Sequence, residues 1–260
     1  MIEALGGYVV GGVRAARELW LVLLGTIAGV IRRAPRPVGA LTRQLYEVGN
    51  RSMVFVLVTL GFIGMVMAYE ACSQLSRITG DYSQIGPQFL RLIVSDFGPT
   101  LTSLMLATRV GAGIAAELGS MKVTEQIDAL RMSGVLPIDY LVVPRFIACV
   151  IMTPLLSTLG AGIMYAAGGL TANASFGVNP HLYFDISLLE RHHVALMLIK
   201  SISFGAAIPI VAGFCGLRAR GSSEGVGRAT TAAVIGSSFA VIILDFVISA
   251  AALWVWGAEL

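Results

Sequence analysis

The sequence predicts an all-α membrane protein with five transmembrane helices, preceded by an N-terminal helix that lies in the membrane interface. Hydrophobic residues make up 56% of the 260 residues and charged residues only 13%, and the mean hydropathy is +0.82. Soluble domains carry about 25% charged residues. The 30 glycines suit helices that pack closely within a bilayer. The composition therefore places the chain in a membrane, and the net charge of +3 gives no sign of nucleic-acid binding.

A spanning helix needs about 20 mostly apolar residues. Five such runs occur, at residues 52–69, 90–116, 141–172, 194–217 and 229–258. The N-terminal run 19–31 is too short to cross. It contains Trp20, follows Arg14 and Arg17, and precedes the basic stretch RRAPRP, so we expect it to lie in the interface plane. We therefore divide the chain into an N-terminal cytoplasmic and interfacial region, residues 1–51, and a transmembrane domain, residues 52–260.

The distribution of basic residues predicts the orientation of the chain. If the N-terminus is cytoplasmic, fourteen of the 18 Lys and Arg residues fall on the inner side. The other four are Arg77, Arg91, Arg191 and Lys200. Cytoplasmic loops are enriched in Lys and Arg, so we expect a cytoplasmic N-terminus and, after five spans, a C-terminus on the far side.

The loop between the second and third spans carries an unusual charged stretch, ATRVGAGIAAELGSMKVTEQIDALRMSG, at residues 107–134. Apolar residues recur along it at helical spacing, while a second face steps by three through Lys122, Glu125, Asp128 and Arg131. Ser120 marks a start and Gly134 a stop. We expect a helix at about residues 117–134 that acts as a lever on the two spans it joins. The alternative is a solvated connecting helix that pairs its own charges and binds nothing.

Several segments together resemble the MlaE/YrbE family, the permease subunits of lipid-transporting ABC systems associated with MCE proteins. The charged stretch carries the strongest likeness, and RQLYEVGNRSM, PRFIA, LIKS, SEGVGRATTAAV and LDFVISA follow the same family in order. The resemblance implies a homodimer of five-span chains, each with a coupling helix that docks on a cytoplasmic ATPase. The residues to which it assigns this contact are Arg109, Glu117, Lys122, Glu125, Asp128 and Glu224.

The resemblance also implies a function. Such a permease moves phospholipids between the bacterial inner membrane and a periplasmic MCE-type carrier, which maintains outer-membrane lipid asymmetry. The only lysines, Lys122 and Lys200, are not preceded by glycine, so the chain has no P-loop. We therefore expect no catalytic activity and no cofactor in this chain. ATP and Mg would be bound by the partner ATPase. The resemblance also implies a small STAS-domain protein that binds to this ATPase.

Three ionisable residues stand out within the predicted spans: Asp96, Lys200 and Asp245. At 1.5 Å per residue, Lys200 lies roughly 9 Å below the outer surface, with Asp96 about as deep and Asp245 roughly 24 Å above the inner surface. All three thus fall in the outer half of the bilayer. Charges there are costly, so we interpret them as a patch at the mouth of a lipid cavity, as the resemblance implies. A buried ion pair that only fixes helix packing is the alternative. Ser95 stands where the family pattern leads us to expect a second charge.

The first span contains Gly64-x-x-x-Ala68, a pair that permits close helix approach. Packing within one subunit explains this pair, whereas the resemblance implies that the helix lines a lipid cavity. In that case the lining is Phe55, Leu57, Leu60, Gly64, Met65, Met67 and Tyr69.

Other classes of function are weighed against this one. An integral-membrane lipid-modifying enzyme needs a nucleophile, an acid/base pair or a metal site, and no histidine falls in a predicted span. A membrane permease or channel for another hydrophobic or small solute is a further alternative. A passive channel or a permease for small polar solutes should show a continuous polar-lined path, whereas the three intramembrane charges fall at one depth. A structural scaffold leaves the intramembrane charges unexplained. The adjacent His192 and His193 have no third ligand at a suitable spacing, so we expect no metal site.

Overall fold

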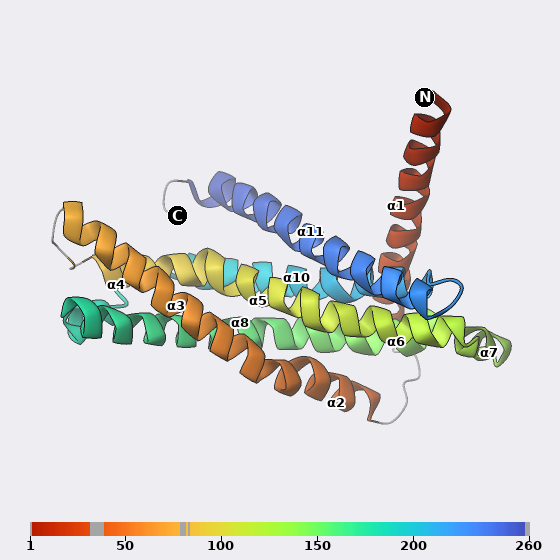
Figure 1. Cartoon of the computed structure of the whole chain (residues 1–260), viewed down its shortest axis with the longest axis horizontal. Coiled ribbons are helices and arrows are strands. Elements are labelled where there is room, and N and C mark those ends of the chain that lie inside the picture. The colour runs from red at the N-terminus through yellow and green to blue at the C-terminus, as the bar shows by residue number, and fades with distance from the viewer. Residues whose placement is uncertain (1, 32–38, 79–81, 83, 258–260) are drawn as a thin grey trace. The chain divides into compact units, whose positions relative to one another are not determined.

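The computed structural model describes residues 2–31, 39–78, 82 and 84–257, and over these it contains helices and no strands (Figure 1). Within this described part of the chain, five helical stretches are long and apolar enough to span a membrane: Ala40–Arg77, Ile85–Val123, Ile138–Phe176, Arg191–Leu217 and Ser223–Val255. The five predicted spans are confirmed in number and position. Each stretch begins before the predicted start, because polar residues at the ends continue the helices.

The stretches are built from shorter elements in chain order. The α-helices are α1 (Ile2–Ile31), α2 (Ala40–Leu45), α3 (Arg51–Ile78), α4 (Ile85–Leu92), α5 (Gly98–Leu106), α6 (Ala112–Val123), α7 (Gln126–Met132), α8 (Val143–Phe176), α9 (Pro180–Tyr183), α10 (Arg191–Leu217) and α11 (Ser223–Trp256). Four π-helical segments join some of them: η1 (Tyr46–Asn50), η2 (Ile93–Phe97), η3 (Ala107–Gly111) and η4 (Ile138–Val142).

The N-terminal helix is longer than the sequence pattern predicts. Helix α1 has 30 residues and extends the expected helix of residues 19–31 toward the N-terminus. Four glycines at positions 6, 7, 11 and 12 lower the helix propensity there, yet the helix continues through them. The basic stretch RRAPRP falls outside the described residues, and the interfacial position of α1 stays a prediction.

The π-helical segment η2 has a local chemical cause. Pro99 has no backbone N–H, so it cannot donate to the carbonyl four residues earlier, that of Ser95. The backbone N–H of Gly98 instead bonds to the carbonyl of Ile93, five residues back. The resulting wide turn is the kind of π-bulge that is frequent at functional sites.

The chain forms two compact units. Unit 1 comprises Met1–Leu45, Ala107–Cys149 and Ala206–Ala240. Unit 2 comprises Tyr46–Leu106, Val150–Gly205 and Val241–Leu260. Helices α8, α10 and α11 each contribute residues to both units.

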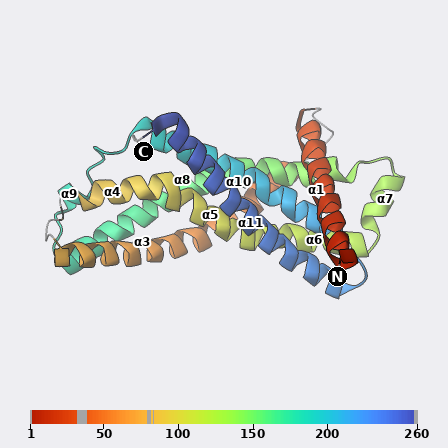
Figure 2. The same cartoon turned by 90° about the horizontal axis from the view of Figure 1, so that it is seen from above.

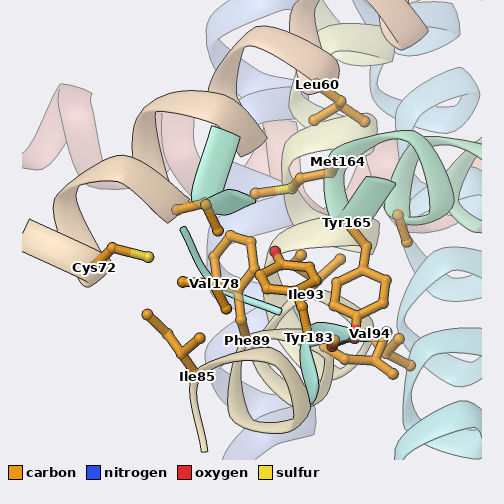
Figure 3. Packing of buried hydrophobic residues seen from close by; sticks show 14 of the residues in the cluster. Leu60, Cys72, Ile85, Phe89, Ile93, Val94, Met164, Tyr165, Val178 and Tyr183 are labelled. Atoms are coloured by element: carbon orange, nitrogen blue, oxygen red, sulfur yellow. Dashed lines mark hydrogen bonds between the residues drawn. The ribbon is translucent and has the colours of Figure 1, made fainter. Parts of the chain in front are cut away.

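The core of unit 2 gathers aromatic residues from three elements (Figure 3). Phe89 of α4 lies beside Tyr165 of α8 and Tyr183 of α9, whose rings stack with centroids 5.0 Å apart. The Tyr165 hydroxyl donates a hydrogen bond to the Tyr183 carbonyl. Burial raises the pKa of the Tyr183 phenol. Glycine makes this packing possible, because a Cβ on Gly86 would lie 2.0 Å from the Tyr183 carbonyl oxygen.

Helices α3 and α8 are in close contact within the same unit. A Cβ on Gly64 would lie 2.2 Å from the backbone oxygen of Met164. A Cβ on Gly160 would lie 2.4 Å from Leu60 Cδ1. The two backbones therefore approach as closely as small residues allow.

Candidate functional site

The structure brings the three intramembrane charges together in unit 2. Lys200 of α10 is completely buried, and its ammonium forms ion pairs with Asp96 of η2 and with Asp245 of α11. The Nζ–Oδ1 distance to Asp245 is 2.9 Å. The Thr100 hydroxyl donates a further hydrogen bond to Asp245 at 3.0 Å. We call Asp96, Lys200 and Asp245 the charged triad.

The two carboxylates of the charged triad are not equally enclosed. The Asp96 side chain is 47% exposed and that of Asp245 27%, while Lys200 has no exposed surface. The buried ammonium is therefore neutralised from both sides, and one carboxylate remains open to an incoming group. The ion pair that the packing alternative requires is present. The exposed Asp96 carboxylate is still able to contact a ligand, so the binding interpretation also remains.

A pocket of about 270 Å³ adjoins the open side of the charged triad. Its polar lining consists of Arg91, Ser95, Asp96 and Ser249, and its apolar lining of Leu92, Leu196 and Leu253. The hydroxyls of Ser95 and Ser249 are buried and have no hydrogen-bond partner. Buried polar groups normally have partners, so these hydroxyls are available to a ligand. From the sequence, Arg91 was counted only among the outer basic residues, and Ser249 was not singled out.

The predicted cavity residues of α3 do not share one face. Phe55, Met65 and Tyr69 are exposed, and Leu57 and Met67 are half-buried. Leu60 and Gly64 are instead buried against α8. Gly64 thus serves helix packing within the chain, and the exposed members of the set are the ones left to meet lipid.

The cytoplasmic stretch contains two helices and not one, so the expectation of a continuous helix over 117–134 is wrong. Helix α6 ends at Val123, and α7 begins at Gln126. Between them Glu125 adopts a left-handed conformation with φ of 60°. Figure 2 shows α7 turning away from α6 after this break. The predicted start at Ser120 is also wrong, because this residue lies inside α6.

The predicted stop of the cytoplasmic stretch is confirmed. Gly134 has φ of +78° and follows the last turn of α7. The N–H of Gly134 bonds to the carbonyl of Arg131, and that of Val135 to the carbonyl of Leu130. This pair of bonds is a Schellman motif, which glycine favours because it has no Cβ.

The charges of this stretch pair largely with one another. Lys122 forms an ion pair with Asp128 at 2.7 Å, and Arg131 approaches Asp128 at 3.6 Å. The ammonium of Lys122 donates hydrogen bonds to both Asp128 oxygens and lowers the pKa of this carboxyl. Glu125 is exposed at the break. The pairing brings α7 back onto the end of α6.

A second ion pair fastens α6 to α8. Glu117 pairs at 2.7 Å with Arg145, whose side chain is only 5% exposed. Arg145 also donates to the carbonyl of Leu141. The sequence reasoning counted Arg145 only among the inner basic residues, although an arginine just inside a span is itself a signal of a specific partner. The pair therefore links the end of α6 directly to the beginning of α8.

The remaining predicted contact residues lie apart from this pair. Arg109 is half-buried in η3. Glu224 is exposed in the first turn of α11 and pairs with Arg228 at 2.8 Å. His192 lies 3.3 Å from Glu190. Among the residues that the structure describes, no group of three or more His, Cys, Asp or Glu side chains is placed to hold a metal ion.

Comparisons with known proteins agree over most of the chain. A model of the family described as Permease MlaE matches residues 41–251. A probable ABC transporter permease protein of Synechocystis sp. is 38% identical over 208 residues, which cover 79% of each chain. The chloroplastic protein TRIGALACTOSYLDIACYLGLYCEROL 1 of Arabidopsis thaliana is 34% identical over 80% of this chain and 59% of its own length. A protein of Haemophilus influenzae named intermembrane phospholipid transport system permease protein MlaE is 32% identical over 96% of both chains.

Proposed function

Because the chain belongs to the MlaE permease family, and is thus a multi-pass membrane permease, we propose that it moves phospholipid between the bacterial inner membrane and a periplasmic MCE-type carrier. The name of the Haemophilus relative supports the choice of substrate. In this proposal the N-terminus is cytoplasmic and transport maintains outer-membrane lipid asymmetry.

The observation that carries the proposal is the charged triad beside its pocket. A phospholipid headgroup needs a cation for its phosphate, and a zwitterionic one also needs an anion for its ammonium. Arg91 and the open Asp96 carboxylate supply these two charges, and a guanidinium suits phosphate because its N–H groups form a planar fork. The leucines of the pocket suit the first carbons of an acyl chain.

The energy for transport comes, in this proposal, from a cytoplasmic ABC ATPase that binds ATP and Mg. The ATPase grips α6 and α7 through Glu117, Lys122, Glu125 and Asp128. The Glu117–Arg145 pair then passes the movement to α8. A small STAS-domain protein on the ATPase completes the cytoplasmic side.

A homodimer completes the membrane part of the proposal. Helix α11 exposes Phe239, Ile243 and Phe246, each at least 60% accessible. In a monomer this apolar face meets only lipid, whereas a second copy of the chain would cover part of it.

The test is purification of the complex from native membranes, with co-purifying proteins and lipids identified by mass spectrometry. We expect an ATPase, an MCE-domain protein and glycerophospholipid, and we expect Arg91→Gln to retain less lipid. Arg77→Gln is the matched control, because Arg77 is exposed near the end of α3 and does not line the pocket. A chain that purifies alone and free of lipid would refute the proposal, and a bound small solute would favour the rival permease.

A further inference from the structure

Unit 1 holds a second and larger pocket, of about 550 Å³, which is separate from the residues of the charged triad. One wall is α1, where Gly25, Ala28 and Gly29 form a floor without bulky side chains. The other walls are the segment 136–139 before and within η4, and the end of α10. Known ligand pockets have volumes of about 300–1,000 Å³, so this pocket is of a size to hold a ligand.

The lining is apolar inside and charged at the edge. The apolar side chains come from all three walls: Leu21, Val22, Leu136, Ile138, Phe214 and Leu217. The charged residues are Glu18, Arg131, Asp139 and Arg218. An alkyl chain suits the first group, and an anionic group beside the arginines suits the second.

The two arginines keep hydrogen-bonding capacity. Arg131 is 61% exposed, and its 3.6 Å approach to Asp128 is longer than a hydrogen bond. Arg218 is 47% exposed, lies over the Phe214 ring at 5.1 Å, and pairs with Glu18 at 3.4 Å through its Nε. A guanidinium has five N–H donors, so both side chains have donors left for phosphate oxygens.

The exposed side chains of α1 indicate that a ligand with an alkyl chain and an anionic group would come from the membrane. Trp20, Leu24 and Ile31 are exposed on α1, at 58%, 45% and 75%. Exposed Trp and aliphatic side chains on one helix are typical of contact with the membrane interface. The cytoplasmic leaflet of the membrane, which would lie next to α1, contains both alkyl chains and phosphate groups.

We propose that this pocket binds a phospholipid of the cytoplasmic leaflet, with its phosphate on Arg131 and Arg218 and an acyl chain along α1. The inference rests on the orientation adopted under the proposed function but not on transport itself. The ligand would join α1 to α7 and α10, so its occupancy would set how firmly these elements hold together.

Photo-crosslinking tests this site directly. The complex, purified from its own membranes, is placed in vesicles of phosphatidylethanolamine and phosphatidylglycerol that contain a phosphatidylglycerol with a diazirine on one acyl chain. We expect labelling of peptides 18–29 and 136–139. The double variant Arg131→Gln/Arg218→Gln should lower this labelling about tenfold, the effect of losing one charge-assisted hydrogen bond or more.

Two further variants keep the test decisive. Ala28→Phe fills the pocket without changing its charge and should also abolish the labelling, even if the double variant folds poorly. Arg17→Gln removes an exposed positive charge from the same helix but outside the pocket, and should leave labelling unchanged. Labelling of peptides around residues 155–163 of α8, where Leu155, Leu159 and Ile163 are exposed, serves as the internal reference.

Unchanged labelling in both pocket variants would overturn the proposal. Crosslinks from the pocket peptides to another protein of the complex, in place of lipid, would also overturn it. Transport activity does not enter either readout, so failure of the proposed function and failure of this site remain distinguishable.

Discussion

Replacement of Lys200 by methionine separates the two interpretations of the charged triad. The substitution keeps the length of the side chain and removes its charge. Asp96 and Asp245 are then left facing each other without the cation between them. We compare it with the triple variant Asp96→Asn, Lys200→Met, Asp245→Asn, in which all three charges are absent.

The expected magnitude follows from the geometry. At 2.9 Å and an effective dielectric constant of about 20, the Lys200–Asp245 attraction is about 6 kcal/mol before desolvation is subtracted. Removing one member of a buried ion pair costs about 3–5 kcal/mol. Because both carboxylates are partly exposed, we take the lower end, about 3 kcal/mol for Lys200→Met. The triple variant should be within about 1 kcal/mol of the natural protein, since no uncompensated charge remains.

The assay is unfolding in sodium dodecyl sulfate followed by circular dichroism, together with lipid transfer by the reconstituted complex. We expect the single variant to be less stable than the triple variant, and both to lose transfer. A triple variant as unstable as the single one would refute the electrostatic reasoning. A triple variant that still transfers lipid would leave the triad with a packing role only.

Three further predictions concern other parts of the chain. Gly64→Ala places a Cβ 2.2 Å from a carbonyl oxygen of α8 and should cost about 1–3 kcal/mol in the same unfolding assay, whereas Gly162→Ala, with nothing within 4 Å, should cost nothing. Glu117→Gln should cost about 1–2 kcal/mol and lower the lipid moved per ATP hydrolysed; an unchanged ratio would contradict the lever. Lys122 lowers the pKa of the Asp128 carboxyl below its ordinary value of 3.8. The ion pair therefore stabilises the α6–α7 turn above pH 3.8, and this stabilisation is lost as the pH falls through the lower pKa of the folded state. In Lys122→Met the titration midpoint of Asp128, followed by carbon-13 NMR, should rise, and an unchanged midpoint would contradict the pairing.

The spans and the charged triad were predictable because they depend on length and composition. Apolar runs of sufficient length have one stable arrangement in a bilayer, and the 1.5 Å rise converts position into depth. Asp96, Lys200 and Asp245 therefore had to fall at one level. Their mutual contact required the structure, since depth says nothing about the direction in which a side chain points.

The break at Glu125 was not predictable from periodicity. Lys122, Glu125, Asp128 and Arg131 step by three, which is typical of a continuous helix face. In the structure the chain turns at Glu125, and Lys122 reaches Asp128 across that turn. Arg91 and Arg145 were missed for a related reason, because counting charges by side of the membrane does not identify partners.

The π-helical segment η2 makes this part of the chain intolerant of a change in length. A π-bulge holds one residue more than the α-helical turn it replaces. Deleting any single residue between 93 and 97 would restore an ordinary α-helical turn and remove the widened one, while α4 would keep nearly its present orientation, because the extra residue is taken up within the bulge. Ser95 and Asp96 lie in the widened turn itself, so its loss would move them relative to Lys200 and to the pocket, although no residue of α4 would be changed. Homologous chains that keep this pocket should therefore show no insertions or deletions between residues 93 and 97.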